Sequence, residues 1–169
     1  MEDIKILQVV GFKNSGKTTL LSHFVEIAVS AGKTVSAIKH HGHGGRLEMP
    51  AAETDSIRLF ERGAASSLAF GNGVVQLHLK EKEDLKKFID FSRLAEPDVI
   101  FIEGFKRAGF PKIVLVRSPE DWQELKNLSN IELVIVHKGV ALANTQTLEL
   151  GDQLKIDGFL KEWMEGENG

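Results

Sequence analysis

Short apolar runs alternate with segments of helical periodicity along most of this 169-residue chain. The runs are rich in Val, Ile and Leu, which is typical of strands buried in a sheet. They predict strands over residues 4–10, 34–39, 98–104, 112–117 and 131–137. The first two strands enclose a helix, so they form a βαβ unit, whose strands should be parallel with a right-handed crossover.

Helical periodicity fills the intervals between these strands. Apolar residues recur at helical spacing from Leu20 to Val29, and Gly32 follows at a position where helices commonly stop. Further helices are predicted near 54–62, around 84–94, after Pro119 and over 156–165.

A β-hairpin is predicted between the helices near 54–62 and 84–94. Residues 66–70 and 74–80 flank Asn72 and Gly73. Asn-Gly between apolar runs is a strong hairpin signal because both turn residues accept positive φ. A projecting hairpin offers an edge to a second strand, which favours a homodimer; the alternative is an edge covered within the chain.

These elements, with residues 11–18, GFKNSGKT, matching G-x-x-x-x-G-K-[ST] between the first strand and the first helix, predict an α/β fold of the P-loop NTPase type. We expect a single domain over residues 1–169, with a mostly parallel sheet, flanking helices and an inserted β-hairpin. Residues 40–51 contain glycines and a proline without apolar periodicity, so they predict a long loop after the second strand. The sequence contains no visible repeat, linker or domain break.

Composition excludes several classes of function. With 42% hydrophobic and 27% charged residues, the chain has ordinary globular composition, and its net charge of −3 argues against nucleic-acid or membrane binding through bulk electrostatics. Because it has no cysteine, disulfides, thiolate metal sites and cysteine nucleophiles are excluded. The N-terminus lacks signal-peptide features, and no apolar run approaches the roughly 20 residues of a membrane span, so a cytoplasmic location is expected.

The segment between the first strand and the first helix carries the clearest chemistry. Residues 11–18, GFKNSGKT, match G-x-x-x-x-G-K-[ST] in full. In such a loop the glycines let the backbone wrap around phosphates, Lys17 reaches the β- and γ-phosphates, and Thr18 ligates Mg²⁺. The predicted nucleotide-binding residues are Gly11, Lys13, Asn14, Ser15, Gly16, Lys17, Thr18 and Thr19. The alternative is a glycine-rich turn beside a surface lysine.

A P-loop also requires an acid at the end of a neighbouring buried strand, which holds the magnesium directly or through water. Glu103 ends the apolar run 99–102, whereas Asp98 precedes it, so Glu103 is the candidate. Glutamate is one methylene longer than the usual aspartate, which favours a water-mediated contact. The alternative is a surface acid. Lys106 and Arg107 follow, and face either phosphates or solvent.

The loop after the second strand is predicted to act as a switch. Such loops sense the γ-phosphate in P-loop folds, and Lys39, His40 and Asp55 are its candidate chemical contributors. His40, His41 and His43 are spaced so that a zinc site is the alternative. Asp55 either orients an attacking water or begins a capped helix.

The sequence leaves the identity of the base open. Guanine-binding proteins often use N-K-x-D, in which the aspartate accepts from the ring nitrogen and amino group. Residues 137–140, HKGV, contain Lys138 but neither the Asn nor the Asp. Lys138 can stack under a base, but this does not separate guanine from adenine.

Several segments together resemble the molybdopterin-guanine dinucleotide biosynthesis protein B (MobB) family. They are, in chain order, GFKNSGKTTL, IKHHGH, ETDSIRLFERGA, VIFIEGFK, KIVLVR and FLKEWM. The P-loop is shared with many ATPases and GTPases, whereas IKHHGH and IEGFK are much narrower signatures. The resemblance covers nearly the whole chain.

This resemblance implies a dimeric, GTP- and Mg²⁺-binding protein that hydrolyses GTP weakly. It implies an accessory role beside protein A in molybdenum cofactor biosynthesis, where GMP is joined to molybdopterin, with molybdopterin or the molybdenum cofactor as further ligands. The family's phosphate loop falls on Gly11 to Thr19, its strand-end acid on Glu103, and its polar segment on Lys39, His40 and Asp55. This chain has HHGHGG where family members often carry more acidic residues, which leaves a metal or catalytic role of that loop open.

Two other functions are compatible with a P-loop. A small-molecule or nucleoside kinase needs a lid of arginines over the transferred phosphoryl group. The arginines considered for such a lid are scattered, at Arg58, Arg62, Arg107 and Arg117. A nucleotide-dependent binding module without meaningful turnover is the second alternative, so the sequence does not decide whether the protein is an enzyme.

Overall fold

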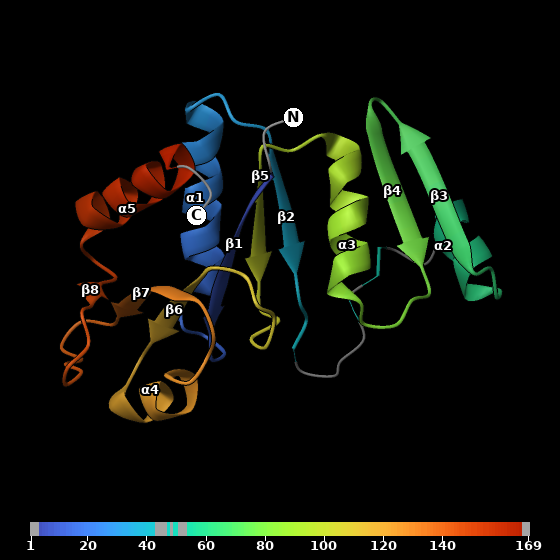
Figure 1. The fold of residues 1–169 in the computed structure, drawn as a ribbon. Coiled ribbons are helices and arrows are strands. Elements are labelled where there is room, and N and C mark those ends of the chain that lie inside the picture. Colours follow the sequence, from blue (N-terminus) through green and yellow to red (C-terminus); the bar gives the residue numbers. More distant parts are fainter. Residues whose placement is uncertain (1–3, 43–46, 48, 51–53, 167–169) are drawn as a thin grey trace. The chain divides into compact units, whose positions relative to one another are not determined.

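The computed structural model describes residues 4–42, 47, 49–50 and 54–166. The chain divides into two compact units, one made of Met1–Gly42 with Lys86–Gly169 and the other of His43–Leu85 (Figure 1). The second unit is therefore an insertion in the sequence of the first. That both belong to one domain over 1–169 stays a prediction.

The first unit is built on a six-stranded sheet. Its strands are β1 (Lys5–Gly11), β2 (Val35–Lys39), β5 (Val99–Glu103), β6 (Lys112–Val116), β7 (Ile131–Val136) and β8 (Leu148–Glu149). Their order is β2-β5-β1-β6-β7-β8, and every neighbouring pair is parallel. The predicted α/β class with a mostly parallel sheet is confirmed.

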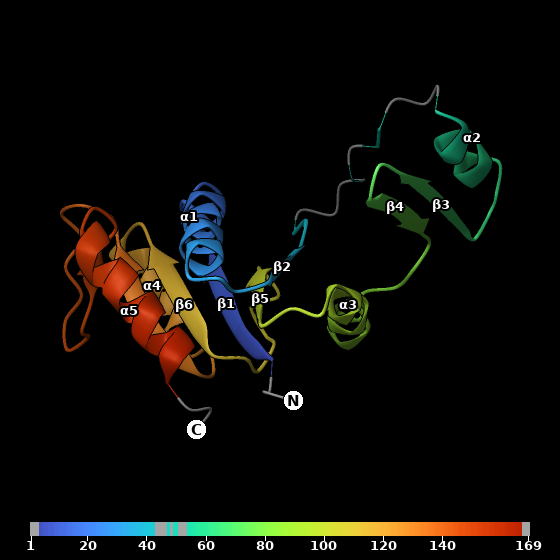
Figure 2. The ribbon, with the colours of Figure 1, turned by 90° about the horizontal axis from the view of Figure 1, so that it is seen from above.

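Four α-helices belong to this unit among the described residues. They are α1 (Lys17–Ser30), α3 (Leu85–Ser92), α4 (Pro119–Leu125) and α5 (Gln153–Glu165), with a short 3₁₀ turn, Arg93–Ala95, after α3. Helices α1 and α5 contribute to one hydrophobic core and α4 to another, and Figure 2 shows these helices around strands β1 and β6. Helices on both faces explain why the strands are nearly continuous apolar runs.

Two hydrophobic cores fill the spaces between the sheet and the helices. In the larger core, α1 and α5 pack through Phe24 and Leu160 against residues such as Leu7 of β1. In the smaller core, α4 packs through Leu125 on the opposite side, against residues that include Val10. Alternate residues of β1 thus enter different cores, which holds this central strand rigidly.

The second unit contains α2 (Asp55–Glu61) and an antiparallel hairpin of β3 (Ser66–Gly71) and β4 (Val74–Leu79). The turn lies at Asn72 and Gly73, which both have positive φ, as predicted. Ile57 of α2 is fully buried, and Phe60 of α2 lies 5.8 Å from the His78 ring, centroid to centroid. The helix therefore covers one face of the hairpin.

The remaining differences from prediction are at short or terminal elements. The two-residue strand β8 was not predicted, because two residues have no readable periodicity. Helix α5 begins at Gln153, three residues before the predicted start at Ile156. Within the described part of the chain, no helix has both the length and the apolar character needed to cross a bilayer.

Candidate nucleotide-binding site

The loop between β1 and α1 has the local geometry of a phosphate-binding loop. Strand β1 ends at Gly11 and helix α1 starts at Lys17, so the loop leads directly into the helix N-terminus. Asn14 and Gly16 have left-handed φ angles of 60° and 95°. A Cβ on Gly11 would lie 2.6 Å from Ser15 Oγ and 2.8 Å from the Leu115 carbonyl, so only glycine fits there.

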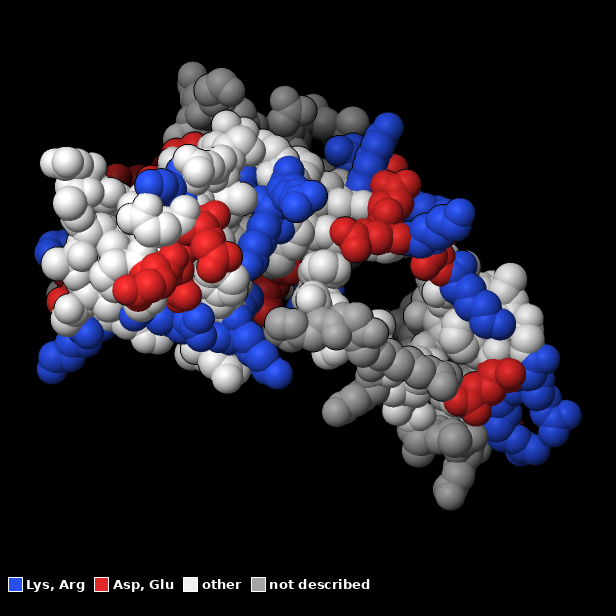
Figure 3. All heavy atoms as spheres, turned by 90° about the horizontal axis from the view of Figure 1, so that it is seen from below, with Lys and Arg blue, Asp and Glu red and all other residues white. Residues whose placement is uncertain are grey.

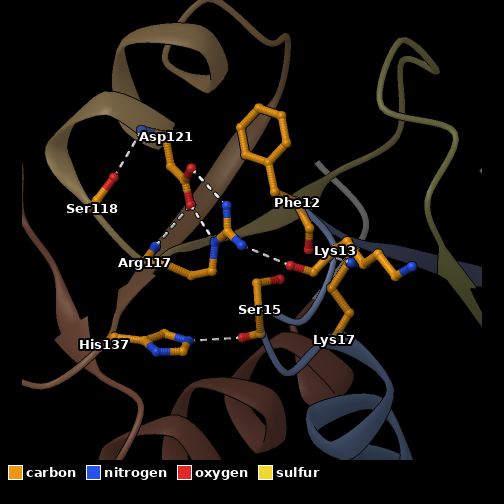
Figure 4. Close-up of polar contacts among 8 residues, drawn as sticks. All are labelled: Phe12, Lys13, Ser15, Lys17, Arg117, Ser118, Asp121 and His137. Atoms are coloured by element: carbon orange, nitrogen blue, oxygen red, sulfur yellow. Dashed lines mark hydrogen bonds and ion pairs between the residues drawn. The ribbon is translucent and has the colours of Figure 1, made fainter.

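The carbonyls of this loop are bound from outside by side chains (Figure 4). Arg117 Nη1 donates to the Lys13 carbonyl at 2.8 Å, and His137 Nε2 donates to the Ser15 carbonyl at 2.9 Å. Lys17 Nζ folds back onto the Phe12 carbonyl at 2.7 Å. A loop whose carbonyls are held in this way can present N–H groups to an anion.

Arg117 is itself held by Asp121 at the start of α4. Its Nε and Nη2 donate to the two carboxylate oxygens of Asp121 at 2.7 and 3.0 Å. This hydrogen-bonded pair lowers the pKa of Asp121 and raises the pKa of Arg117. Ser118 caps α4 by accepting from the Asp121 N–H at 3.3 Å, so the carboxylate has a fixed orientation.

The other side of the loop carries a cluster of Thr18, Glu103 and Lys39. The Thr18 hydroxyl donates to Glu103 Oε2 at 2.8 Å. Lys39 Nζ lies 2.9 Å from Thr18 Oγ1 and 3.0 Å from each Glu103 oxygen. Strand order explains the cluster, because β2, β5 and β1 are neighbours and their carboxyl ends meet at one edge.

This cluster fits a magnesium ion chemically. Mg²⁺ prefers hard oxygen ligands, and the Thr18 hydroxyl and Glu103 carboxylate supply them. The Lys39 ammonium already contacts all three oxygens, which shows that they converge on a space suited to a cation. These residues would therefore hold the metal of a bound magnesium nucleotide.

Positive charge gathers around Lys17. Burial lowers the pKa of Lys17, Glu103 acts in the opposite direction, and the charges of Lys106, Lys39 and Arg117 lower the pKa further. Lys106 Nζ lies 3.9 Å from the centroid of the ring of Phe12, which is a residue of the phosphate loop. Polyanionic phosphates would relieve this repulsion, because they place negative charge among the cations.

The chain turns sharply after Glu103. Gly104 and Phe105 have left-handed φ angles of 92° and 50°, and the Gln8 side chain donates to both of their carbonyls at 2.7 Å. The Phe105 ring stacks on His40 with centroids 4.5 Å apart. A Cβ on Gly104 would lie 2.9 Å from His40 Cβ, so glycine permits this close approach. Both His40 and Phe105 thus pack beside Glu103.

The other predicted switch residues are Asp55, His41 and His43. Asp55 belongs to the second unit, where it is the first residue of α2, follows the N-cap Thr54 and is 95% exposed. This agrees with its role as part of a helix start, and a catalytic role stays a prediction. His41 is exposed, whereas His43 lies outside the described residues. Among the described residues, no group of three His, Asp or Glu side chains could hold a metal ion.

Sequence reasoning missed three residues that contact or support the loop: Arg117, Asp121 and His137. Arg117 and His137 directly follow β6 and β7, and parallel strands end at the same edge of a sheet. The spacing of Arg117 and Asp121, with Ser118 and Pro119 between them, is typical of an ion pair at a helix start. The strand-end positions of Arg117 and His137, and the spacing of Arg117 and Asp121, are the sequence signals that indicate these contacts.

Charged side chains of both signs lie on the face toward which β2 and β5 point. Figure 3 shows lysine and arginine interspersed with aspartate and glutamate on this view of the described residues.

Comparisons with known proteins identify the family. The family model described as "Molybdopterin guanine dinucleotide synthesis protein B" matches residues 6–138. The chain is 36% identical over 166 residues to a probable molybdopterin-guanine dinucleotide biosynthesis adapter protein of Bacillus subtilis, covering 96% of this chain and 95% of the relative. The corresponding adapter protein of Escherichia coli is 27% identical over 171 residues, covering 98% and 97%.

Solved structures give the same result. The crystal structure of Bacillus subtilis MobB matches with a TM-score of 0.83 and 34% sequence identity. The match covers 97% of this chain and 100% of that chain. The crystal structure of a MobB homolog from Bacillus stearothermophilus has a TM-score of 0.76 and 32% identity, covering 94% and 97%.

Proposed function

The chain belongs to the molybdopterin guanine dinucleotide synthesis protein B (MobB) family, and we propose that it is an adapter protein of molybdopterin-guanine dinucleotide biosynthesis that binds Mg²⁺-GTP. The observation that carries the nucleotide proposal is the phosphate loop, whose carbonyls are bound from outside while a Thr18–Glu103 oxygen pair lies beside it. The role in cofactor assembly rests on the names of the relatives.

In the proposed complex, the loop N–H groups and Lys17 bind the β- and γ-phosphates. Lys17 would exchange its bond to the Phe12 carbonyl for phosphate oxygens, while Thr18 and Glu103 hold the magnesium. The metal would supply charge neutralisation between the phosphates. Thr19, one residue further along α1, is proposed to face the α-phosphate.

The hydrogen bonds of Glu103 support slow hydrolysis in the proposed complex. Glu103 accepts from both Thr18 and Lys39, so its oxygens support the cation position and do not activate water. We infer that nucleotide binding controls partner association, and that turnover is secondary.

We also propose a homodimer formed through the hairpin. Facing residues of β3 and β4 share a side, and one side carries five exposed apolar residues beside Ser66, which pairs with Leu79. We call these five residues the open face: Leu68, Phe70, Val75, Leu77 and Leu79. Phe70 is 72% exposed and Leu68 62%. Burial of such residues by a second copy would remove their apolar surface from water, at roughly 25 cal/mol per Å².

The proposed partner in the final step is protein A, which joins GMP to molybdopterin, and the proposed location is the cytoplasm. Molybdopterin or the finished cofactor is a further candidate ligand. Association with protein A, measured with GTP and with a non-hydrolysable GTP analogue, separates an adapter from an enzyme. Binding of protein A that survives loss of turnover supports the adapter function, whereas loss of both together supports coupled hydrolysis.

Calorimetric titration with GTP and with ATP, each with magnesium, tests the nucleotide proposal. We expect selective GTP binding, and a large loss in Lys17→Ala but not in the control Lys33→Ala, since Lys33 lies beyond the opposite end of α1. Preference for ATP, with phosphoryl transfer to a small molecule, would establish the kinase alternative. No binding of either nucleotide would refute the proposal.

A further inference from the structure

Side chains that follow two strands of the sheet hold the phosphate loop in shape. Its conformation requires left-handed backbone at Asn14 and Gly16. Loops of this kind direct N–H groups toward one anion. Such an arrangement is unfavourable without an anion, because the N–H dipoles repel one another. Hydrogen bonds to the carbonyl oxygens of the same peptide groups therefore determine what fraction of the protein has the loop in its phosphate-binding conformation.

Two contacts do this from separate strands. Arg117 follows β6 and donates to the Lys13 carbonyl, whereas His137 follows β7 and donates to the Ser15 carbonyl (Figure 4). The bonded carbonyls lie on either side of Asn14, a residue with left-handed φ. Each bond thus limits rotation of a peptide group next to the strained part of the loop.

The orientation of Arg117 depends on Asp121. Nε and Nη2 are used by the carboxylate, and this leaves Nη1 directed at the Lys13 carbonyl. Only a planar guanidinium satisfies both groups at once, since an ammonium has no fork geometry. Asp121 is buried, and it also neutralises the positive charge of Arg117.

We propose that Arg117, aligned by Asp121, is a positioning residue that prearranges the phosphate loop for the β-phosphate of a nucleoside di- or triphosphate, with His137 as a second brace. This inference rests on the proposed nucleotide-binding function. It differs from a direct phosphate contact, because the guanidinium acts on the outer side of the loop through a carbonyl.

Calorimetric titration with GDP tests this in Arg117→Gln, Asp121→Asn and the double variant. Each single change should weaken GDP binding about tenfold, as expected for loss of one hydrogen bond from a charged donor. The double variant should bind no more weakly than the worse single variant, since both changes break the same contact. Arg117→Lys keeps the charge without the fork, and should not restore binding.

Asp121→Asn separates positioning from direct contact. If Arg117 bound phosphate itself, loss of Asp121 would leave a free cation and GDP binding would stay equal or tighten, which would overturn the proposal. Restored binding in Arg117→Lys would overturn it as well. The matched control is Arg93→Gln, which removes an arginine that lies 3.9 Å from Asp90 in an i,i+3 pair.

Urea unfolding of every variant distinguishes binding from folding. If Arg117→Gln does not fold, Asp121→Asn and Arg117→Lys carry the test. Wild-type protein that binds neither GTP nor GDP would overturn the proposed function and this inference together. Wild-type binding with unchanged affinity in the variants would overturn the positioning role alone.

Discussion

Replacement of Lys39 by methionine should increase the affinity of the nucleotide site for magnesium. The Lys39 ammonium contacts Thr18 Oγ1 and both Glu103 oxygens, which are the groups proposed to hold the metal. A magnesium ion at the same oxygens must displace this ammonium, so lysine and metal compete. Methionine keeps most of the apolar stem and removes the charge.

The size of the effect follows from the exposure of the two side chains. A pair of charges about 3 Å apart at an effective dielectric constant of about 20 attracts by about 5 kcal/mol before desolvation. The Glu103 side chain is 7% exposed but that of Lys39 is 55% exposed, so solvent screens much of this attraction. Exposed pairs contribute up to about 1 kcal/mol, and burial of one partner places this pair at or slightly above that upper end, at about 1 to 1.4 kcal/mol. We therefore expect a five- to tenfold change in apparent magnesium affinity, where about 1.4 kcal/mol is tenfold.

The assay measures GDP affinity at increasing magnesium concentrations, with a fluorescent GDP analogue as the probe. GDP is used because a displaced Lys39 side chain can reach a γ-phosphate, which would obscure the competition. The half-maximal magnesium concentration should be about five- to tenfold lower in Lys39→Met than in wild-type protein. Lys33→Met, outside the site, is the matched control and should leave it unchanged.

An unchanged or higher magnesium requirement in Lys39→Met would refute the competition. Thr18→Ala serves as a second check, because it removes a proposed metal ligand and should abolish most of the magnesium dependence. If Thr18→Ala retains the full dependence, the metal does not bind at these oxygens and the reasoning fails at an earlier step.

Three further predictions concern stability and association. Lys112 is fully buried and donates to three backbone carbonyls, so Lys112→Met should lower the free energy of unfolding by about 3 kcal/mol in urea titrations; a loss below 1 kcal/mol would contradict this. Because its hydrogen bond with Arg117 lowers the pKa of Asp121, this carboxylate stabilises the fold above its unfolded-state pKa, and that contribution is lost as pH falls through the lower folded-state value. The stability difference of about 1 kcal/mol between wild-type and Asp121→Asn should therefore shrink below about pH 4, and a difference that is constant with pH would exclude this origin. Phe70→Lys should shift the protein from dimer to monomer in sedimentation velocity, whereas a dimer of equal strength would show that the open face is not the interface.

Much of the fold could be predicted because its signals are local. The alternation of apolar runs and helical periods identified the helices and the five longer strands of the six-stranded sheet. Asn72-Gly73 identified the hairpin turn. The phosphate loop was equally readable, since glycines at fixed spacing before a helix are a local requirement. Strand β8 could not be predicted, because its two residues pair with β7 only after the sheet has formed.

The contacts of the site were decided by tertiary structure. Sequence identified Lys39 and Glu103 as separate candidates, but only the order β2-β5-β1 brings them together at Thr18. Arg117 and His137 reach the loop because β6 and β7 continue the sheet on the other side of β1.

The physical reason is that periodicity and propensity act over a few residues, whereas strand order is set by packing of the whole sheet. By itself, the sequence determined the elements, the phosphate loop and the family signatures. The tertiary structure decides which side chains hold that loop and that Lys39 lies beside Thr18 and Glu103. These contacts join segments that are far apart in the chain, and the segments meet only when both hydrophobic cores have formed.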